Sequence, residues 1–104
     1  TAEAAEAHND LGVALTRLGR EAEALAEYEK SLAGGCPLAH FNLGKALRRR
    51  FAASGDPADR RRARESFAAF GRWLDSGAAL PPAVEYNLPE LREYLAEAAR
   101  SLGE

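Results

Sequence analysis

Three side chains of this sequence are of types that bind metals or act in catalysis: His8, His40 and the single cysteine, Cys36. A zinc site needs three or four such ligands, and no Cys, Asp or Glu recurs beside both histidines at ligand spacing. A cysteine–histidine pair would need an orienting group and oxyanion donors, and the sequence offers neither. We therefore expect half-buried packing roles for both histidines and a small apolar role at a turn for Cys36. We expect no enzymatic activity, metal or cofactor.

A second chemical feature is a cluster of arginines in the middle of the chain. Residues 45–64 carry eight basic and two acidic side chains, whereas residues 1–44 and 65–104 each carry three basic and seven acidic ones. Such a segment can bind an anionic partner, either an acidic protein or peptide or a nucleic acid. The alternative is a solvated helix surface whose arginines pair with local carboxylates. A sequence pI of about 5.7 disfavours nucleic acid, because the acidic flanks repel phosphate.

The composition around these side chains favours helices. The chain has 104 residues, the size of one small domain, with Ala as its commonest residue, two Val and no Ile. Strands favour β-branched residues, so a sheet is disfavoured. No uncharged stretch is long enough to span a bilayer. The chain opens at Thr1 and contains no Met, which we interpret as a trimmed N-terminus or a piece of a longer protein; among compartments we favour the cytoplasm.

Glycines, prolines and capping residues divide the chain into segments. Apolar residues spaced by three and four predict helices over residues 3–18, 21–33, 37–53, 57–75 and 88–103, with one helical turn at 83–86. Asp56 and Pro57 predict a sharp helix start, and residues 87–90 resemble a capping box. In the first helix we expect one face to be buried: Ala4, Ala7, Leu11, Ala14, Leu15 and Leu18.

An internal repeat lies within these helices. Residues 7–15 (AHNDLGVAL) recur as residues 39–47 (AHFNLGKAL), with six identical residues at an offset of 32. A helix pair that recurs at this period is typical of a helical solenoid. The pattern of Leu-Gly, a large residue, and Ala-x-x-x-aromatic on the next helix resembles the tetratricopeptide repeat. The matching residues are Leu11, Gly12, Leu15, Ala24 and Tyr28, then Leu43, Gly44, Leu47, Ala63 and Phe67.

The resemblance implies an all-α, right-handed solenoid of two antiparallel helix pairs plus a C-terminal helix, in one domain over residues 1–104. Repeat 1 covers about 4–36, repeat 2 about 37–76, a linker 77–87 and a capping helix 88–103. Within each pair, the small Gly and Ala allow close approach and the aromatic ring fills the gap beside them. We expect the capping helix to cover Phe67, Phe70 and Trp73.

The sequence departs from the family pattern in ways that can be interpreted. His8 and His40 stand where the family usually has Trp. The second unit has seven extra residues between Leu47 and Ala63. We expect these to lengthen both helices of the second pair by about one turn, or roughly 5 Å. The added turns contain Arg49, Arg50, Arg60, Arg61 and Arg62, which would place the basic segment on a protruding hairpin tip.

The resemblance also implies a function, because the first helix of each tetratricopeptide pair lines a concave groove that binds extended peptides or partner helices. By this resemblance the groove residues are Asn9, Val13, Thr16, Arg17, Phe41, Lys45, Arg48 and Arg49. Their cations would bind carboxylates, so we expect an acidic protein or peptide as partner. Loss of binding in Phe41→Ala or Arg48→Glu, with folding intact, would mark this function.

Two other functions remain open. The chain could be a self-assembling scaffold unit of a larger bacterial complex, a homo-oligomer in which acidic flanks meet the basic hairpin or the solenoid ends stack. It could also bind nucleic acid through the Arg-rich hairpin.

Overall fold

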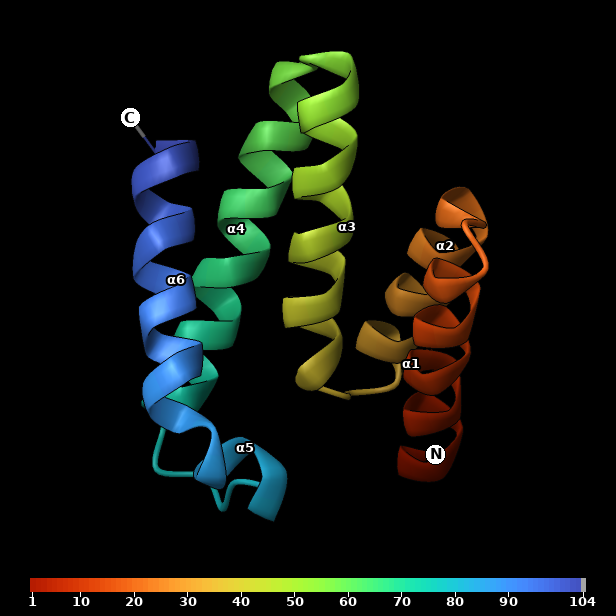
Figure 1. Cartoon of the computed structure of the whole chain (residues 1–104). Coiled ribbons are helices and arrows are strands. Elements are labelled where there is room, and N and C mark those ends of the chain that lie inside the picture. Colours follow the sequence, from red (N-terminus) through yellow and green to blue (C-terminus); the bar gives the residue numbers. More distant parts are fainter. Residues whose placement is uncertain (104) are drawn as a thin grey trace.

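The computed structural model describes residues 1–103, which contain six α-helices and no strand (Figure 1). Their bounds are α1 Ala2–Arg17, α2 Glu21–Ala33, α3 Leu38–Ser54, α4 Pro57–Leu74, α5 Pro82–Tyr86 and α6 Leu88–Gly103. The all-α class and the five long helices are confirmed, and α5 is the short helix expected in the linker. The breaks fall at glycines with positive φ, which glycine adopts at little cost: Gly19, Gly35, Gly55 and Gly77.

The helices form two layers. In the inner layer, Asn42 on α3 donates a hydrogen bond to Asn9 on α1 at 2.9 Å, and Arg48 on α3 pairs with Glu97 on α6 at 2.7 Å. The outer layer holds α2 and α4, which an Arg–Glu ion pair of 2.9 Å joins. Each of α1 to α3 packs against the next helix in the chain, and α6 packs against α4. The core therefore lies between the two layers.

An aromatic ring on a glycine joins the two helices of each pair. A Cβ at Gly12 would lie 2.6 Å from Cδ1 of Tyr28, and a Cβ at Gly44 would lie 2.8 Å from Cδ1 of Phe67. Both rings are buried. They fill the space that a side chain on the glycine would take. The close helix approach predicted from the glycine and aromatic positions is therefore confirmed in both units.

The second helix pair is longer than the first at one end. α3 continues for ten residues after Gly44, whereas α1 continues for five after Gly12. α4 begins six residues before Ala63, whereas α2 begins three residues before Ala24. The extra turns form the green tip that rises above α1 and α2 in Figure 1. The predicted lengthening of about one turn per helix is confirmed.

The C-terminal helix covers the aromatic face of α4, as predicted. The Tyr94 ring of α6 lies 5.6 Å from the Phe67 ring. Leu95 of α6 packs against both core clusters, one of which contains Phe67 and the other Phe70; Phe70 is 1% exposed. Trp73 is half-buried, with its ring 5.7 Å from the Phe70 ring. These contacts make α6 part of the core rather than an appended segment.

The face of α1 that the apolar spacing predicted to be buried is mostly exposed, so this prediction is wrong. Only Leu15 of that face is buried, and Leu11 and Leu18 are 47% and 70% exposed. The buried residues of α1 are Ala5, Asn9, Gly12 and Leu15. Both α2 and α3 contact α1. The Tyr28 ring of α2 packs where α1 has no side chain, at Gly12, so the face of α1 that contains Gly12 turns towards α2 and is buried. Asn9 tolerates burial because it accepts the hydrogen bond from Asn42.

Residues 87–90 do not form the predicted capping box. The Asn87 side chain donates from Nδ2 to the Ala83 carbonyl of α5 at 2.8 Å. Its own carbonyl accepts from the N–H of Leu91 at 2.9 Å. The side chain therefore closes α5 while the main chain begins α6, because a short helix immediately before α6 offers the amide a nearer acceptor.

Candidate binding surfaces

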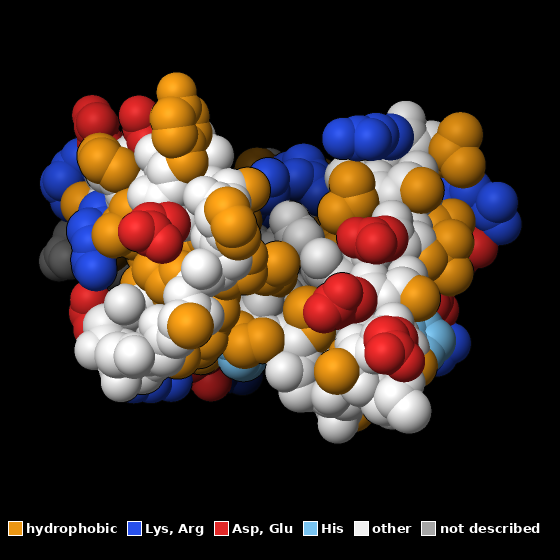
Figure 2. All heavy atoms as spheres, turned by 90° about the horizontal axis from the view of Figure 1, so that it is seen from below, with side chains coloured by type: hydrophobic (Ala, Val, Ile, Leu, Met, Phe, Trp, Pro, Cys, Tyr) orange, Lys and Arg blue, Asp and Glu red, His pale blue; other side chains and the backbone are white. Residues whose placement is uncertain are grey.

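The first candidate surface is the inner face, formed by the layer of α1, α3 and α6. Figure 2 shows this region end-on. The molecule is hollowed between its N-terminal and C-terminal helices, and Lys and Arg side chains lie in the hollow. All the residues predicted to bind a partner lie on α1 or α3 of this layer. Several of these residues, however, make hydrogen bonds, ion pairs or ring contacts within the protein, and the others remain free to bind a partner.

Asn9 and Phe41 act mainly in packing. Asn9 is 7% exposed and holds α1 to α3 through Asn42. The Phe41 ring lies 5.0 Å from the Phe70 ring and 5.2 Å from the Tyr94 ring. Such ring pairs contribute beyond their buried area. A Phe41→Ala variant would therefore disturb folding, contrary to the expectation that it affects binding alone.

Arg48 also contributes to the packing of α6. Its guanidinium donates to both carboxylate oxygens of Glu97, at 2.8 and 2.7 Å, and to Ser101 Oγ at 2.9 Å. It lies 5.6 Å from the centre of the Tyr94 ring. Its hydrogen bond with Glu97 raises the pKa of Arg48 and lowers the pKa of Glu97. Arg48→Glu would set two carboxylates against each other, so it too would disturb folding.

Lys45 is a half-buried cation among the predicted binding residues that has no carboxylate partner in residues 1–103. Its Nζ lies 4.9 Å from the centre of the Phe41 ring, and the residue is half-buried. Burial, together with the nearby charge of Arg49, lowers the pKa of Lys45. None of the ion pairs formed within residues 1–103 includes Lys45. An anion placed here would stabilise the ammonium group.

Two further predicted residues on α1 remain accessible beside this cation. Val13 is half-buried and packs on the edge of the core, and Arg17 is exposed. Arg17 takes part in none of the ion pairs of the described residues either. Arg49, in contrast, pairs with Glu21 of α2 at 3.1 Å, with both side chains exposed. On the inner face, Lys45, Arg17 and Val13 are therefore accessible to a partner. Arg49 could bind a partner's carboxylate in place of Glu21.

The Arg-rich hairpin is largely neutralised by carboxylates. Arg50 donates two hydrogen bonds, of 2.9 and 2.7 Å, to Asp59 across the hairpin, and Arg62 pairs with Glu29 of α2 at 2.9 Å. Asp59 is buried, and its hydrogen bonds with Arg50 lower the pKa of its carboxyl group. Arg60 donates to the Leu102 carbonyl at 2.6 Å. The interpretation in which the arginines pair locally is therefore confirmed for much of the segment.

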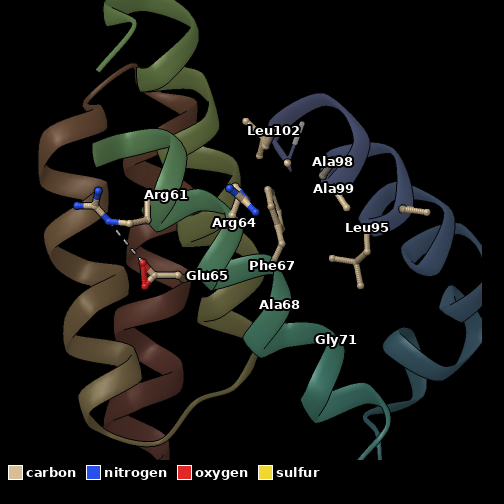
Figure 3. Close-up of a pocket in the computed structure, with 12 residues that line it drawn as sticks. Arg61, Arg64, Glu65, Phe67, Ala68, Gly71, Leu95, Ala98, Ala99 and Leu102 are labelled. Carbon is tan, nitrogen blue, oxygen red and sulfur yellow. Dashed lines mark ion pairs between the residues drawn. The ribbon is translucent and has the colours of Figure 1, made fainter. Parts of the chain in front are cut away.

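The second candidate surface is a groove of about 760 Å³ between α4 and α6 (Figure 3). Its lining is mainly apolar, with Phe67 at the base and Leu95 and Leu102 on the α6 side. Both Arg61 and Arg64 of α4 belong to the lining; Arg64 lies near Leu102, whereas the Arg61 side chain turns away from α6 towards Glu65 (Figure 3). The sequence did not predict this groove, because it forms between helices whose packing depends on the linker and on α5.

The three side chains with potential catalytic chemistry, His8, His40 and Cys36, are half-buried or buried. His8 Nδ1 lies 2.7 Å from Glu27 Oε1, and Lys30 donates to the same carboxylate at 2.9 Å. The hydrogen bond with Lys30 lowers the pKa of Glu27 most, and the hydrogen bond with His8 lowers it further. His40 is half-buried, and burial lowers its pKa. Cys36 is buried at the turn after α2. Residues 1–103 contain no group of three His, Cys, Asp or Glu arranged to hold a metal ion.

Several functional contacts were not predicted from the sequence. Glu97 and Tyr94 could not have been matched to Arg48, because they lie on a helix far along the chain. The pair of Arg50 and Asp59 could have been found, since the two residues flank the predicted turn at Gly55 at similar distances. A charge on each side of a helix hairpin is a usable signal for such a bridge.

Comparison of the chain with protein-family models, with curated proteins and with solved structures gives no match. Within residues 1–103, no helix combines the length and the apolar character that a membrane crossing requires.

Proposed function

We propose that this chain is a non-catalytic protein-interaction module of the tetratricopeptide type, which binds an acidic peptide or helix on its inner face. The proposal rests mainly on the environment of Lys45, a half-buried cation on the inner face. A half-buried ammonium group beside Arg49, without a carboxylate partner among the described residues, would be stabilised by a bound anion. An aspartate, a glutamate or a C-terminal carboxylate of a partner would supply that anion.

The two helix pairs support the architectural part of the proposal. Each pair has a glycine on its first helix and an aromatic ring of its second helix packed on that glycine. The first helices, α1 and α3, lie side by side in the inner layer. These contacts support the proposed architecture of two repeated helix pairs.

The paired arginines make nucleic acid the weaker candidate. A nucleic-acid interface needs several cations that are free to contact phosphates. Arg48, Arg49, Arg50 and Arg62 are each bound to a carboxylate, so a phosphate would have to compete for them. In residues 48–64, Arg64 is the arginine bound neither to a carboxylate nor to a main-chain carbonyl of the described residues, so the hairpin offers phosphates one unengaged arginine.

The test uses a short extended peptide rich in Asp and Glu, with a counterpart in which lysines replace the acids, and follows backbone amides by NMR. The acidic peptide should shift amide signals around Val13 and Lys45, and Lys45→Gln should weaken its binding about tenfold. Arg61→Gln removes the same charge from an exposed position on α4, and should weaken binding less than about twofold. Equal losses in both variants, or shifts centred on residues 60–64, would contradict the proposal.

A further inference from the structure

The outer side of α1 carries an exposed apolar stripe. Its members are spaced by three and four residues, so they form a continuous line along the helix: Ala4, Ala7, Leu11, Ala14 and Leu18. Leu18 is the C-cap residue and is the most exposed large apolar side chain of α1 at 70%. An unbroken line of this length on a surface helix marks a contact surface.

The second repeat unit shows what such a stripe does when it is covered. At the offset of 32, the counterparts of Ala7, Leu11 and Ala14 are Ala39, Leu43 and Ala46. These are only 0%, 5% and 1% exposed, and α3, which carries them, packs against α2. The stripe of α1 therefore has the character of a buried helix contact, but no element of residues 1–103 covers it.

The groove between α4 and α6 is a second uncovered apolar surface, and it lies at the other end of the molecule (Figures 1 and 3). Small residues on both of its sides, Ala68 and Gly71 on α4 and Ala99 on α6, leave room for a helix to approach closely. Because α1 and α6 lie on opposite sides of α3, one molecule cannot bring its own stripe into its own groove.

The charges around the two surfaces are complementary. Three exposed carboxylates flank the stripe of α1, from Glu3, Glu6 and Asp10, and none takes part in an ion pair within residues 1–103. The exposed cation on this side of α1 is Arg17, near the C-terminal end of the stripe. At the groove, Arg64 has no carboxylate partner in residues 1–103, and Arg61 reaches Glu65, the carboxylate of the groove lining, only at 4.0 Å. Opposite charges beside two apolar surfaces favour their association and orient it.

We infer that the stripe of α1 in one copy of this chain docks in the α4–α6 groove of a second copy. The contact joins two different surfaces, so it is heterologous and leaves a free stripe and a free groove at the two ends of each dimer. Further copies add in the same direction, and the assembly grows with protein concentration. This inference does not depend on peptide binding at the inner face.

Two variants block the two halves of this contact separately. Leu11→Arg places a cation in the stripe, where it would face the arginines of the groove. Ala99→Glu places bulk and negative charge in the groove. Both residues are exposed, so folding should be retained, which circular dichroism checks. Ala26→Glu, at an exposed position of α2 outside both surfaces, is the control for a change of surface charge.

Sedimentation velocity at several protein and salt concentrations then measures the assembly. Wild type and Ala26→Glu should form larger species as concentration rises and smaller ones as salt rises from about 0.05 to about 0.5 M. Each blocking variant alone should associate at least about tenfold more weakly. A mixture of the two should form a dimer with one copy of each and grow no further, because one supplies an intact stripe and the other an intact groove.

Three results would overturn the inference. If wild type stayed monomeric up to about 1 mM, a second copy of the chain would not be what binds in the groove. Ala99→Glu that dimerises normally, beside Leu11→Arg that does not, would indicate symmetric pairing of α1 with α1. Association that neither variant changes would place the contact on another surface.

Discussion

Replacing Gly44 by alanine should destabilise the protein, although alanine is the better helix former. The added Cβ would lie 2.8 Å from both Cδ1 and Cε1 of the Phe67 ring. An ordinary contact needs at least about 3.4 Å, so the ring would have to move by about 0.6 Å. Phe67 is 6% exposed and has the rings of Phe41 and Tyr94 beside it, with centres at 6.1 and 5.6 Å. The movement would therefore press against α6.

The balance of two effects gives the magnitude. Forcing an extra methyl group into a packed site costs about 1–3 kcal/mol, and the clash at Gly44 with a confined ring belongs in the upper part of that range. Replacing glycine in a helix returns roughly 1 kcal/mol. We expect the free energy of unfolding to fall by about 1–2 kcal/mol. In a domain of this size the melting temperature should fall by roughly 5–15 °C.

Gly71→Ala is the matched control, because this glycine also lies within a helix. A Cβ there would meet only Leu95 Cδ1, at 3.9 Å, which is an ordinary contact. The free energy of unfolding should rise by about 0.5–1 kcal/mol. Urea denaturation followed by circular dichroism measures both variants. If Gly44→Ala were as stable as Gly71→Ala, the close packing of Phe67 on α3 would be refuted.

Three further predictions test the contacts around the inner layer and the hairpin. Phe41→Ala should lower the free energy of unfolding by about 2–3 kcal/mol in urea denaturation, because three aromatic rings lose a neighbour. Arg48→Gln should speed amide hydrogen exchange in α6 but not in α1 and α2, because it loses its charged contact with Glu97; uniform acceleration would contradict this. Asp59→Asn should be less stable than wild type above the ordinary aspartate pKa of 3.8. Because Arg50 lowers the folded-state pKa of this carboxyl group, that stability is lost as pH falls through it, and the difference between the two proteins should shrink towards zero in acid denaturation.

The helices could be predicted because local signals decide them. The glycines that follow the ends of helices have positive φ, a conformation that glycine adopts readily. Asp56 accepts a hydrogen bond from the Ala58 N–H at 2.9 Å, as expected of the residue that caps the N-terminus of α4. The glycine–aromatic contacts could also be predicted, because both partners belong to one helix pair.

What could not be predicted depends on contacts between distant elements. Apolar spacing on α1 defines a stripe, but it does not say whether another element covers it, and the Tyr28 contact turns Gly12 inward instead. Phe41 and Arg48 have the chemistry of binding residues. Their use in docking α6 depends on Tyr94 and Glu97, whose positions are set by the linker and α5.

The most direct test of the proposed function is an NMR titration of the two lysine side chains, Lys30 and Lys45, labelled by carbon-13 methylation. In the free protein, Lys45 should titrate below its ordinary pKa of 10.5. Saturating acidic peptide should raise the pKa of Lys45, because a carboxylate stabilises its ammonium group, and should leave the Lys30 signal unmoved. A Lys45 signal that does not respond to the peptide, or a Lys30 signal that responds equally, would contradict peptide binding at the inner face.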